Sequence, residues 1–369
     1  MLELPKYTSA FLNLTQRCNL KCRYCFVKQQ PKDMTLEVAK DSVDWLLGNC
    51  DGDKKPSVNF FGGEPMLKYD EIIVPLVEEY GDKVYWSITT NGLLLNKDRL
   101  DWMNSKNFGY LLSIDGDKKT QDYNRPCHDG QSSFDILEPK LKTILDAWSD
   151  ITFRATLDKD TVENLYENYL FAEEKGFKSA TFILNVFEDW NDHDLEILKD
   201  QLYKIGQHIE DKANNGEAYC QFSQFPTIWG QVQSGKNKAW RSQGLGTPGA
   251  GRCGIGGNFC CGIGCDGKVY TCQDMTDNVD CDRFCVGSIY DGVSDQARLK
   301  AIGDFDPWMV RSSKDGACDT CVMSDTCTGG CNINNYFKYQ DLHIQDYSLC
   351  RYDQLCFEVV DKVMKGKVK

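Results

Sequence analysis

Three cysteines that follow an apolar run near the start of the chain constrain its fold most strongly. They have the spacing Cys18-x3-Cys22-x2-Cys25, directly after residues 10–15, which read as a buried strand. Thiolates at this spacing can bind three corners of an iron–sulfur cube that has four metal corners. One iron then stays open, and metal sites with an open position are the reactive ones. The sequence therefore predicts a reactive iron–sulfur cluster in this loop.

A second group of cysteines lies near the end of the chain, with the spacing Cys318-x2-Cys321-x5-Cys327-x3-Cys331. The start of the chain has no signal-peptide pattern, so we expect a cytoplasmic protein, in which a framework of disulfides is rare. Zinc is the alternative ligand for paired cysteines. On spacing alone it remains open for this second group, whereas the first loop has no partner pair nearby.

The composition excludes several other classes of function. The net charge of −13 and the pI near 4.9 argue against a nucleic-acid partner and against an anionic membrane surface, since both need a basic face. Four histidines are few for a histidine-based metal enzyme. No run approaches the length of apolar residues that a membrane span needs, so we expect none.

Strand-like and helix-like stretches alternate along the first two-thirds of the chain. The sequence predicts strands at 10–15, 57–61, 84–90, 108–114, 151–157 and 180–186, and helices at 35–47, 70–80, 97–105, 134–147, 161–175 and 194–213. Six such units imply a parallel sheet with helices outside it. Because six units are too few for a closed barrel, we expect an α/β fold, a partial (β/α)6 TIM-like barrel, over residues 1–235.

The rest of the chain, residues 236–369, is rich in cysteine and turns, and we expect it to form a smaller iron–sulfur domain. Asp266-Gly267 has the composition of a hairpin turn. Residues 353–364 read as a closing helix.

Polar motifs follow the predicted strands, where parallel sheets bind their ligands. These motifs contain Gly62-Gly63-Glu64-Pro65, Thr89-Thr90-Asn91-Gly92, Ser113-Ile114-Asp115-Gly116 and, further on, Arg125. Two adjacent glycines allow backbone to approach a ligand closely, and a glutamate can accept a hydrogen bond from an ammonium group.

With the cysteine loop, these motifs resemble the radical SAM superfamily over roughly residues 8–215. The resemblance implies that Cys18, Cys22 and Cys25 bind a [4Fe–4S] cluster whose open iron binds S-adenosylmethionine. In that family a 5′-deoxyadenosyl radical then removes a hydrogen atom from the substrate. The remaining roles concern S-adenosylmethionine: Tyr24 within the cysteine motif, Gly62, Gly63 and Glu64 at the ammonium group, Asn91 at a ribose hydroxyl, and Ser113 and Arg125 at the carboxylate or ribose.

The C-terminal cysteines resemble the SPASM extension of peptide- and protein-modifying members. The resemblance implies two auxiliary [4Fe–4S] clusters, and three in total. Cys318, Cys321, Cys327 and Cys350 would bind the second auxiliary cluster, and Cys253, Cys272 and Cys331 the first. The fourth ligand of the first is Cys260, Cys261 or a substrate thiolate. Cys265, Cys281, Cys285 and Cys356 exceed the pattern.

SPASM relatives include maturases that form thioether bonds in ribosomal peptides and anaerobic enzymes that oxidise a sulfatase cysteine or serine to formylglycine. The sulfatase group carries an aspartate directly after the second cysteine of the first auxiliary cluster. Here Gln273 follows Cys272, and Asp274 comes one step later, on the other face of a strand. Asp274 remains a candidate base, and peptide maturation with thioether formation is the first hypothesis.

Two further expectations concern partners. Only seventeen residues precede Cys18, which leaves no room for a leader-peptide-binding domain, so we expect the peptide or protein substrate to bind directly or through a separate protein. The resemblance also implies an external electron donor of the flavodoxin or ferredoxin type. A redox sensor or a zinc scaffold is the non-enzymatic alternative, and neither would cleave S-adenosylmethionine.

Overall fold

The computed structural model describes residues 6–50, 54–234, 260–276, 282–298, 310–324, 326–327 and 329–368. The chain forms two compact units that are not successive in sequence. The first comprises residues 1–21, 25–111 and 246–306, and the second comprises 22–24, 112–245 and 307–369. The sequence predicts a domain boundary near residue 235. Each of the two compact units instead contains segments from before and after that residue.

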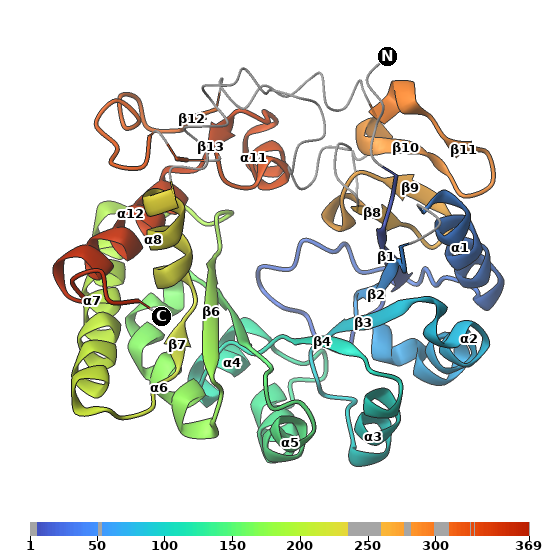
Figure 1. Ribbon diagram of the computed structural model, residues 1–369, viewed down its shortest axis with the longest axis horizontal. Coiled ribbons are helices and arrows are strands. Elements are labelled where there is room, and N and C mark those ends of the chain that lie inside the picture. Colours follow the sequence, from blue (N-terminus) through green and yellow to red (C-terminus); the bar gives the residue numbers. More distant parts are fainter. Residues whose placement is uncertain are drawn as a thin grey trace. The chain divides into compact units, whose positions relative to one another are not determined.

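An eight-stranded sheet forms the first unit, in the order β11-β10-β9-β8-β1-β2-β3-β4 (Figure 1). Its strands are β1 Ser9–Thr15, β2 Ser57–Gly62, β3 Tyr85–Thr90, β4 Gly109–Leu112, β8 Cys260–Ile263, β9 Lys268–Tyr270, β10 Cys285–Ser288 and β11 Gly292–Val293. β1 pairs in parallel with β2 and, on its other edge, with β8. β8 and β9 form the predicted hairpin. The first part of the cysteine-rich region thus extends the N-terminal sheet, which the sequence did not predict.

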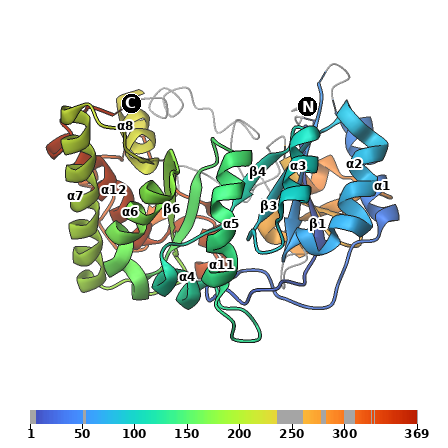
Figure 2. The same ribbon diagram turned by 90° about the horizontal axis from the view of Figure 1, so that it is seen from below.

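Alternate side chains of these strands form the core of the first unit. Leu12, Phe60 and Ile88 are fully buried, and Phe60 stacks on Trp86 with ring centroids 5.5 Å apart. The helices are α1 Leu36–Asn49, α2 Val74–Tyr80 and α3 Lys97–Ser105. Figures 1 and 2 show all three on the same side of the sheet. Asn59 alternates with the buried Phe60 along β2 and therefore lies on the opposite face of the sheet.

Local signals explain where these helices begin. The Thr35 side chain accepts a hydrogen bond from Val38 N (3.2 Å) and caps α1, as predicted. The helix predicted at 70–80 is instead a π-helical turn, η2 Tyr69–Ile73, followed by α2. Pro75 explains the difference, because it has no N–H to donate and its ring crowds the preceding turn.

A three-stranded parallel sheet, β5-β6-β7, organises the second unit. Its strands are β5 Phe153–Leu157, β6 Ser179–Leu184 and β7 Gln221–Phe222, and a separate pair is formed by β12 Arg311–Ser312 and β13 Ile344–Gln345. The helices are α4 Lys118–Asn124, α5 Ser133–Ala147, α6 Leu165–Lys175, α7 Asp192–Asn215, α8 Gln224–Ser234, α11 Asn332–Tyr339 and α12 Tyr347–Lys362. Ile114 N donates to Arg154 O (3.0 Å), which joins the chain that follows β4 to β5.

The C-terminal helix α12 is an integral part of the second unit. It packs against α7 and α8 (Figure 2). A Cβ atom on Gly206 of α7 would lie 2.3 Å from Val359 Cγ1, so the close approach of the two helices needs a glycine there. Tyr352 of α12 donates from its hydroxyl to Phe182 O on β6 (2.7 Å). Among the described residues, no helix has both the length and the apolar character that crossing a membrane requires.

Candidate functional site

Gly62, which ends β2, and Gly63 accommodate the chain's own backbone. A Cβ atom on Gly63 would lie 2.1 Å from Arg17 O, and one on Gly62 would lie 2.3 Å from Thr15 O. Gly62 also has a φ of +127°, which other residues rarely adopt. The glycines let the loop after β2 pack on the segment that leads into Cys18, and the close approach to a ligand that the sequence indicates stays a prediction.

Glu64 ties the ends of β2 and β3 together. Its carboxylate is buried and accepts hydrogen bonds from Met66 N (3.0 Å), Thr90 Oγ1 (2.8 Å) and Asn91 N (2.8 Å). A carboxylate offers about four acceptor positions, so these three donors occupy most of its capacity. Burial nonetheless raises the pKa of Glu64 to about 7.

Glu64 gives the stability of the protein a specific pH dependence. The pKa of Glu64 is about 7 in the folded state and 4.5 ordinarily. Between pH 4.5 and pH 7, Glu64 therefore holds a proton in the folded state that it lacks in the unfolded state. The contribution of Glu64 therefore falls as the pH rises from about 4.5 to about 7, by about 3 kcal/mol. We expect the difference in unfolding free energy between wild type and Glu64→Gln to shrink by that order between about pH 5 and pH 8. Anaerobic denaturant titrations measure it, and a constant difference would exclude this titration.

Asn91, after β3, contacts the cysteine loop directly. Its Nδ2 donates to Asn19 Oδ1 (2.7 Å) and lies 3.8 Å from Cys18 Sγ. Leu20 N lies 3.4 Å from the same sulfur. Donors at a cysteine sulfur favour the thiolate, which is the form that binds metal. The ribose contact predicted for Asn91 remains a prediction.

Tyr24, Asp115 and Arg125 form a network of one hydrogen bond and one ion pair in the second unit, in which Asp115 and Arg125 are buried. The Tyr24 hydroxyl donates to Asp115 Oδ2 (2.6 Å), and Arg125 Nη2 lies 3.0 Å from Asp115 Oδ1. Burial works against the charge of Arg125, but Asp115 holds the pKa of Arg125 above its ordinary value. Burial raises the pKa of Tyr24, so its hydroxyl stays protonated as a donor. Asp115 belongs to the Ser113-Ile114-Asp115-Gly116 motif, in which the sequence predicts a ligand-binding role only for Ser113.

A second arginine leaves this network with excess positive charge. Arg154 lies on β5 beside Ser113, with which it forms a parallel bridge. Burial and the nearby charge of Arg125 lower the pKa of Arg154. No carboxylate among the described residues forms an ion pair with Arg154, and the buried Arg125 Nε likewise has no hydrogen-bond partner there. Two guanidinium groups and one carboxylate fit an anionic ligand group such as a carboxylate.

The three cysteines of the first motif differ in their exposure to solvent. Cys25 is exposed, and Cys18 and Cys22 are half-buried. Cys18 and Cys25 belong to the first unit and Cys22 to the second. Accessible thiols with donors at Cys18 Sγ suit the binding of an iron–sulfur cluster. Within the second unit, the excess arginine charge separately suits a carboxylate-bearing ligand.

Four cysteines of the C-terminal group surround one cavity. The cavity measures about 250 Å³ and is lined by Cys318, Cys321, Cys327 and Cys350. Ser312 N donates to Cys318 Sγ (3.3 Å). No three histidine, cysteine or acidic side chains in the described ranges converge tightly enough for a single metal ion. Four thiols around a cavity of this size fit a [4Fe–4S] cluster, which contains eight atoms, better than they fit a single zinc ion.

The cysteines predicted for the first auxiliary cluster lie in different places. Cys260 and Cys261 begin β8 and Cys272 follows β9, all in the first unit, whereas Cys331 precedes α11 in the second. Cys253 lies outside the described residues. Cys261 is fully buried, and burial raises its pKa well above the ordinary value, whereas Cys260 is half-buried.

Asp274 does not lie on a strand. Cys272 caps a short 3-10 helix, η5 Gln273–Met275, which contains Asp274. The prediction that Asp274 lies on a strand, one step beyond Gln273 and on the opposite face, is therefore wrong, because β9 ends at Tyr270. The side chain of Asp274 is half-buried.

The fold and these residues define a class of protein. The profile of the radical SAM superfamily matches residues 12–202, more than half of the chain. The chain therefore belongs to the radical SAM superfamily, whose members bind S-adenosylmethionine and a [4Fe–4S] cluster. The predicted α/β fold with a SPASM-like, cysteine-rich C-terminal region is confirmed.

Particular relatives cover nearly the whole chain. It is 24% identical over 339 residues to the cysteine-type anaerobic sulfatase-maturating enzyme of Clostridium perfringens strain 13, with 85% of each chain covered. It is also similar in structure to native anSMEcpe with bound AdoMet and Cp18Cys peptide (TM-score 0.71, 22% identity, covering 97% and 98% of the two chains). For Streptococcus suis SuiB bound to precursor peptide SuiA, the TM-score is 0.58 at 15% identity, with 93% and 76% covered. These structural likenesses show the fold.

Proposed function

We propose that this protein is a radical SAM maturase that forms thioether crosslinks in a ribosomally made, cysteine-containing peptide. The observation that carries the proposal is the cavity with four cysteine thiols, present in addition to the three-cysteine loop. A cluster held by four cysteines has no open corner, which suits an electron carrier rather than a reactive centre. The similarity to structures with bound peptides supports a peptide as the substrate.

Three [4Fe–4S] clusters are proposed. Cys18, Cys22 and Cys25 would hold the reactive one, Cys318, Cys321, Cys327 and Cys350 the second auxiliary cluster, and Cys253, Cys260, Cys272 and Cys331 the first. We place Cys260 rather than Cys261 in that set, because the Cys261 thiol is enclosed on the buried face of β8 and resists deprotonation. A thiolate of the substrate remains the alternative fourth ligand.

Thioether formation removes one hydrogen atom from the attacked carbon, and one proton and one electron from the substrate thiol. When bound, S-adenosylmethionine and the clusters supply a carbon-centred radical for the hydrogen atom and one-electron carriers for the electron. Asp274, in η5, is the proposed acceptor of the thiol proton. The net reaction oxidises the substrate, so the enzyme is an oxidoreductase.

The remaining site residues would bind S-adenosylmethionine. Arg125 and Arg154 together carry one positive charge more than Asp115 neutralises, which suits the carboxylate of S-adenosylmethionine, and Ser113 lies beside Arg154. Tyr24 would stay a neutral donor that fixes Asp115. Glu64 has one acceptor position left, which suits an ammonium proton. Gly62 and Gly63 keep the strand-end loop close to the cysteine segment, and Asn91 is proposed at a ribose hydroxyl.

Oxidation of a sulfatase cysteine or serine to formylglycine is the second candidate. One observation favours it: the match to the sulfatase-maturating enzyme covers 85% of both chains. The position of Gln273 directly after Cys272 speaks against it, given the aspartate expected there in that group. For either reaction we propose a cytoplasmic enzyme that draws electrons from a flavodoxin- or ferredoxin-type donor and has no nucleic-acid or membrane partner.

The masses of the products separate the two reactions. The reconstituted enzyme is incubated anaerobically with S-adenosylmethionine, reductant and two sets of peptides, cysteine-containing precursor peptides and sulfatase-derived peptides. We expect a precursor peptide to lose two hydrogen atoms, with its thiol no longer alkylated by iodoacetamide. Conversion of the sulfatase peptide to an aldehyde that reacts with hydrazine would instead establish the second candidate. If 5′-deoxyadenosine forms but neither peptide is changed, both substrate assignments are wrong.

A further inference from the structure

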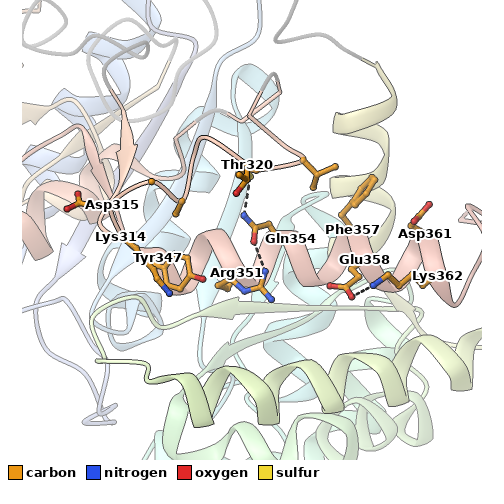
Figure 3. A pocket seen from close by; sticks show the side chains of 14 residues that line it. Lys314, Asp315, Thr320, Tyr347, Arg351, Gln354, Phe357, Glu358, Asp361 and Lys362 are labelled. Carbon is orange, nitrogen blue, oxygen red and sulfur yellow. Dashed lines mark hydrogen bonds and ion pairs between the residues drawn. The ribbon is translucent and has the colours of Figure 1, made fainter.

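A side chain on α12 connects one cysteine of the C-terminal cavity to an arginine. Gln354 Nε2 donates to Cys321 Sγ at 3.1 Å. Arg351 Nη1 donates to Gln354 Oε1 at 2.6 Å. Figure 3 shows Arg351 and Gln354 side by side on α12, with the amide reaching toward the loop that carries Thr320. The three groups therefore form a chain from the arginine to the sulfur.

The orientation of this amide follows from the chemistry of its neighbours. The oxygen and nitrogen of a glutamine side chain are hard to distinguish by shape, but an arginine can only donate hydrogen bonds. Gln354 must therefore turn its oxygen to Arg351, and its NH2 group then faces Cys321. A cysteine sulfur that binds iron carries negative charge and accepts such a bond. Arg351 thus fixes Gln354 as a donor to the sulfur.

Cys321 and Gln354 form part of the wall between the cavity and the protein surface. Both line the cavity of the four cysteines, and both also line a surface groove of about 540 Å³. Lys314, Tyr347 and Lys362 lie along this groove (Figure 3). The Cys321 corner is therefore the one where a bound cluster comes near the surface on this side.

We propose that Gln354, held by Arg351, is a positioning residue that raises the reduction potential of the cluster bound by Cys318, Cys321, Cys327 and Cys350. The inference rests on the proposed function, in which these cysteines bind a [4Fe–4S] cluster. Reduction adds negative charge to the cluster and its sulfurs, so a donor at Cys321 Sγ stabilises the reduced form more than the oxidised form. Cys318 and Cys327 each accept a bond from a backbone N–H group, and Cys327 Sγ also contacts the Gln345 side chain (3.9 Å). The bond to Cys321 is donated by a side chain and can be removed by substitution.

The test is a potentiometric titration followed by electron paramagnetic resonance, with iron content measured on every sample. The full chain is titrated as a variant in which Cys18, Cys22 and Cys25 are replaced by alanine. This variant lacks the proposed reactive cluster, so only the resonance signals of the two auxiliary clusters remain. For Gln354→Leu, which keeps the size but loses the donor, we expect the reduction equilibrium constant of one cluster to fall about tenfold, or about 59 mV for one electron. Gln354→Glu should lower it further, because it brings a negative charge to the sulfur. The matched control is Gln207→Leu, an exposed glutamine of α7 that binds Asp211, and it should leave both potentials unchanged.

The outcomes separate this inference from the proposed function. An unchanged potential in Gln354→Leu at full iron content would overturn the role of Gln354 and leave the cluster assignment intact. Absence of iron from the Cys318 group in the wild type would overturn the assignment itself. If Gln354→Leu fails to assemble its cluster, Arg351→Leu decides, because it keeps the amide but frees its orientation. A smaller fall in the same potential supports the proposal, and no change overturns it.

Discussion

Replacing Cys18, Cys22 and Cys25 together by alanine is expected to abolish the formation of 5′-deoxyadenosine. These thiols are the proposed ligands of the open cluster, and without it S-adenosylmethionine has no iron to bind. The auxiliary cysteines stand on other elements, so we expect iron to fall from about twelve to about eight atoms per chain rather than to zero. Iron analysis and chromatography of the anaerobic reaction measure both quantities.

The matched control for this variant is Cys50→Ala. Cys50 is a buried cysteine after α1 whose sulfur lies 3.2 Å from Lys54 O, and no cluster role is assigned to it. It should keep its full iron content and its cleavage activity. Turnover that persists in the triple variant would refute the role of the loop. Loss of all iron would instead mean that the auxiliary clusters depend on it.

Asp115→Asn is expected to give the largest loss of stability among single substitutions at the site. Asp115 is the carboxylate that pairs with Arg125, and it also accepts from the Tyr24 hydroxyl and from Thr156 N (3.0 Å). Removing its charge leaves the buried Arg125 and the half-buried Arg154 close to each other without a counter-ion. Breaking a buried ion pair in this way costs about 3–5 kcal/mol of unfolding free energy. Anaerobic denaturant titration measures the loss, and binding of S-adenosylmethionine should weaken as Arg125 moves.

An exposed aspartate provides the control for this prediction. Asp135 pairs with Lys118 on the surface, where an ion pair contributes about 0–1 kcal/mol. Asp135→Asn should therefore change the unfolding free energy little. Equal effects of the two substitutions would show that Asp115 does not neutralise the arginines. A double variant, Asp115→Asn with Arg154→Leu, should recover part of the lost stability, because it removes one of the two like charges.

Much of the fold follows from local signals in the sequence. The prediction of a helix over Lys97–Ser105 is confirmed residue for residue, with Asn96 as its cap. One helix and one strand pairing illustrate the physical reasons why other features were missed. α4, Lys118–Asn124, is polar throughout and has no apolar period, so only its cap, Asp117, could have indicated it. The parallel pairing of β8 with β1 joins residues about 250 positions apart, and no local pattern encodes such a contact.

The site was predictable where spacing carries the chemistry. Cys318, Cys321, Cys327 and Cys350, to which the family resemblance assigns one cluster, line one cavity, and cluster binding itself stays a prediction. Arg154 was missed, although a single charged residue between the buried positions Phe153 and Ala155 of a strand is a usable signal. The contact between Gln354 and Cys321 depends on how α12 packs against the cysteine loop, which a single sequence does not reveal.

The most direct test of the account is the reaction of the reconstituted wild-type protein with S-adenosylmethionine. The protein is loaded anaerobically with iron and sulfide, reduced with dithionite and assayed for iron content and for 5′-deoxyadenosine. We expect about twelve iron atoms per chain and reductant-dependent formation of 5′-deoxyadenosine. A protein that binds only zinc, or one that carries its clusters but forms no 5′-deoxyadenosine, would contradict the account.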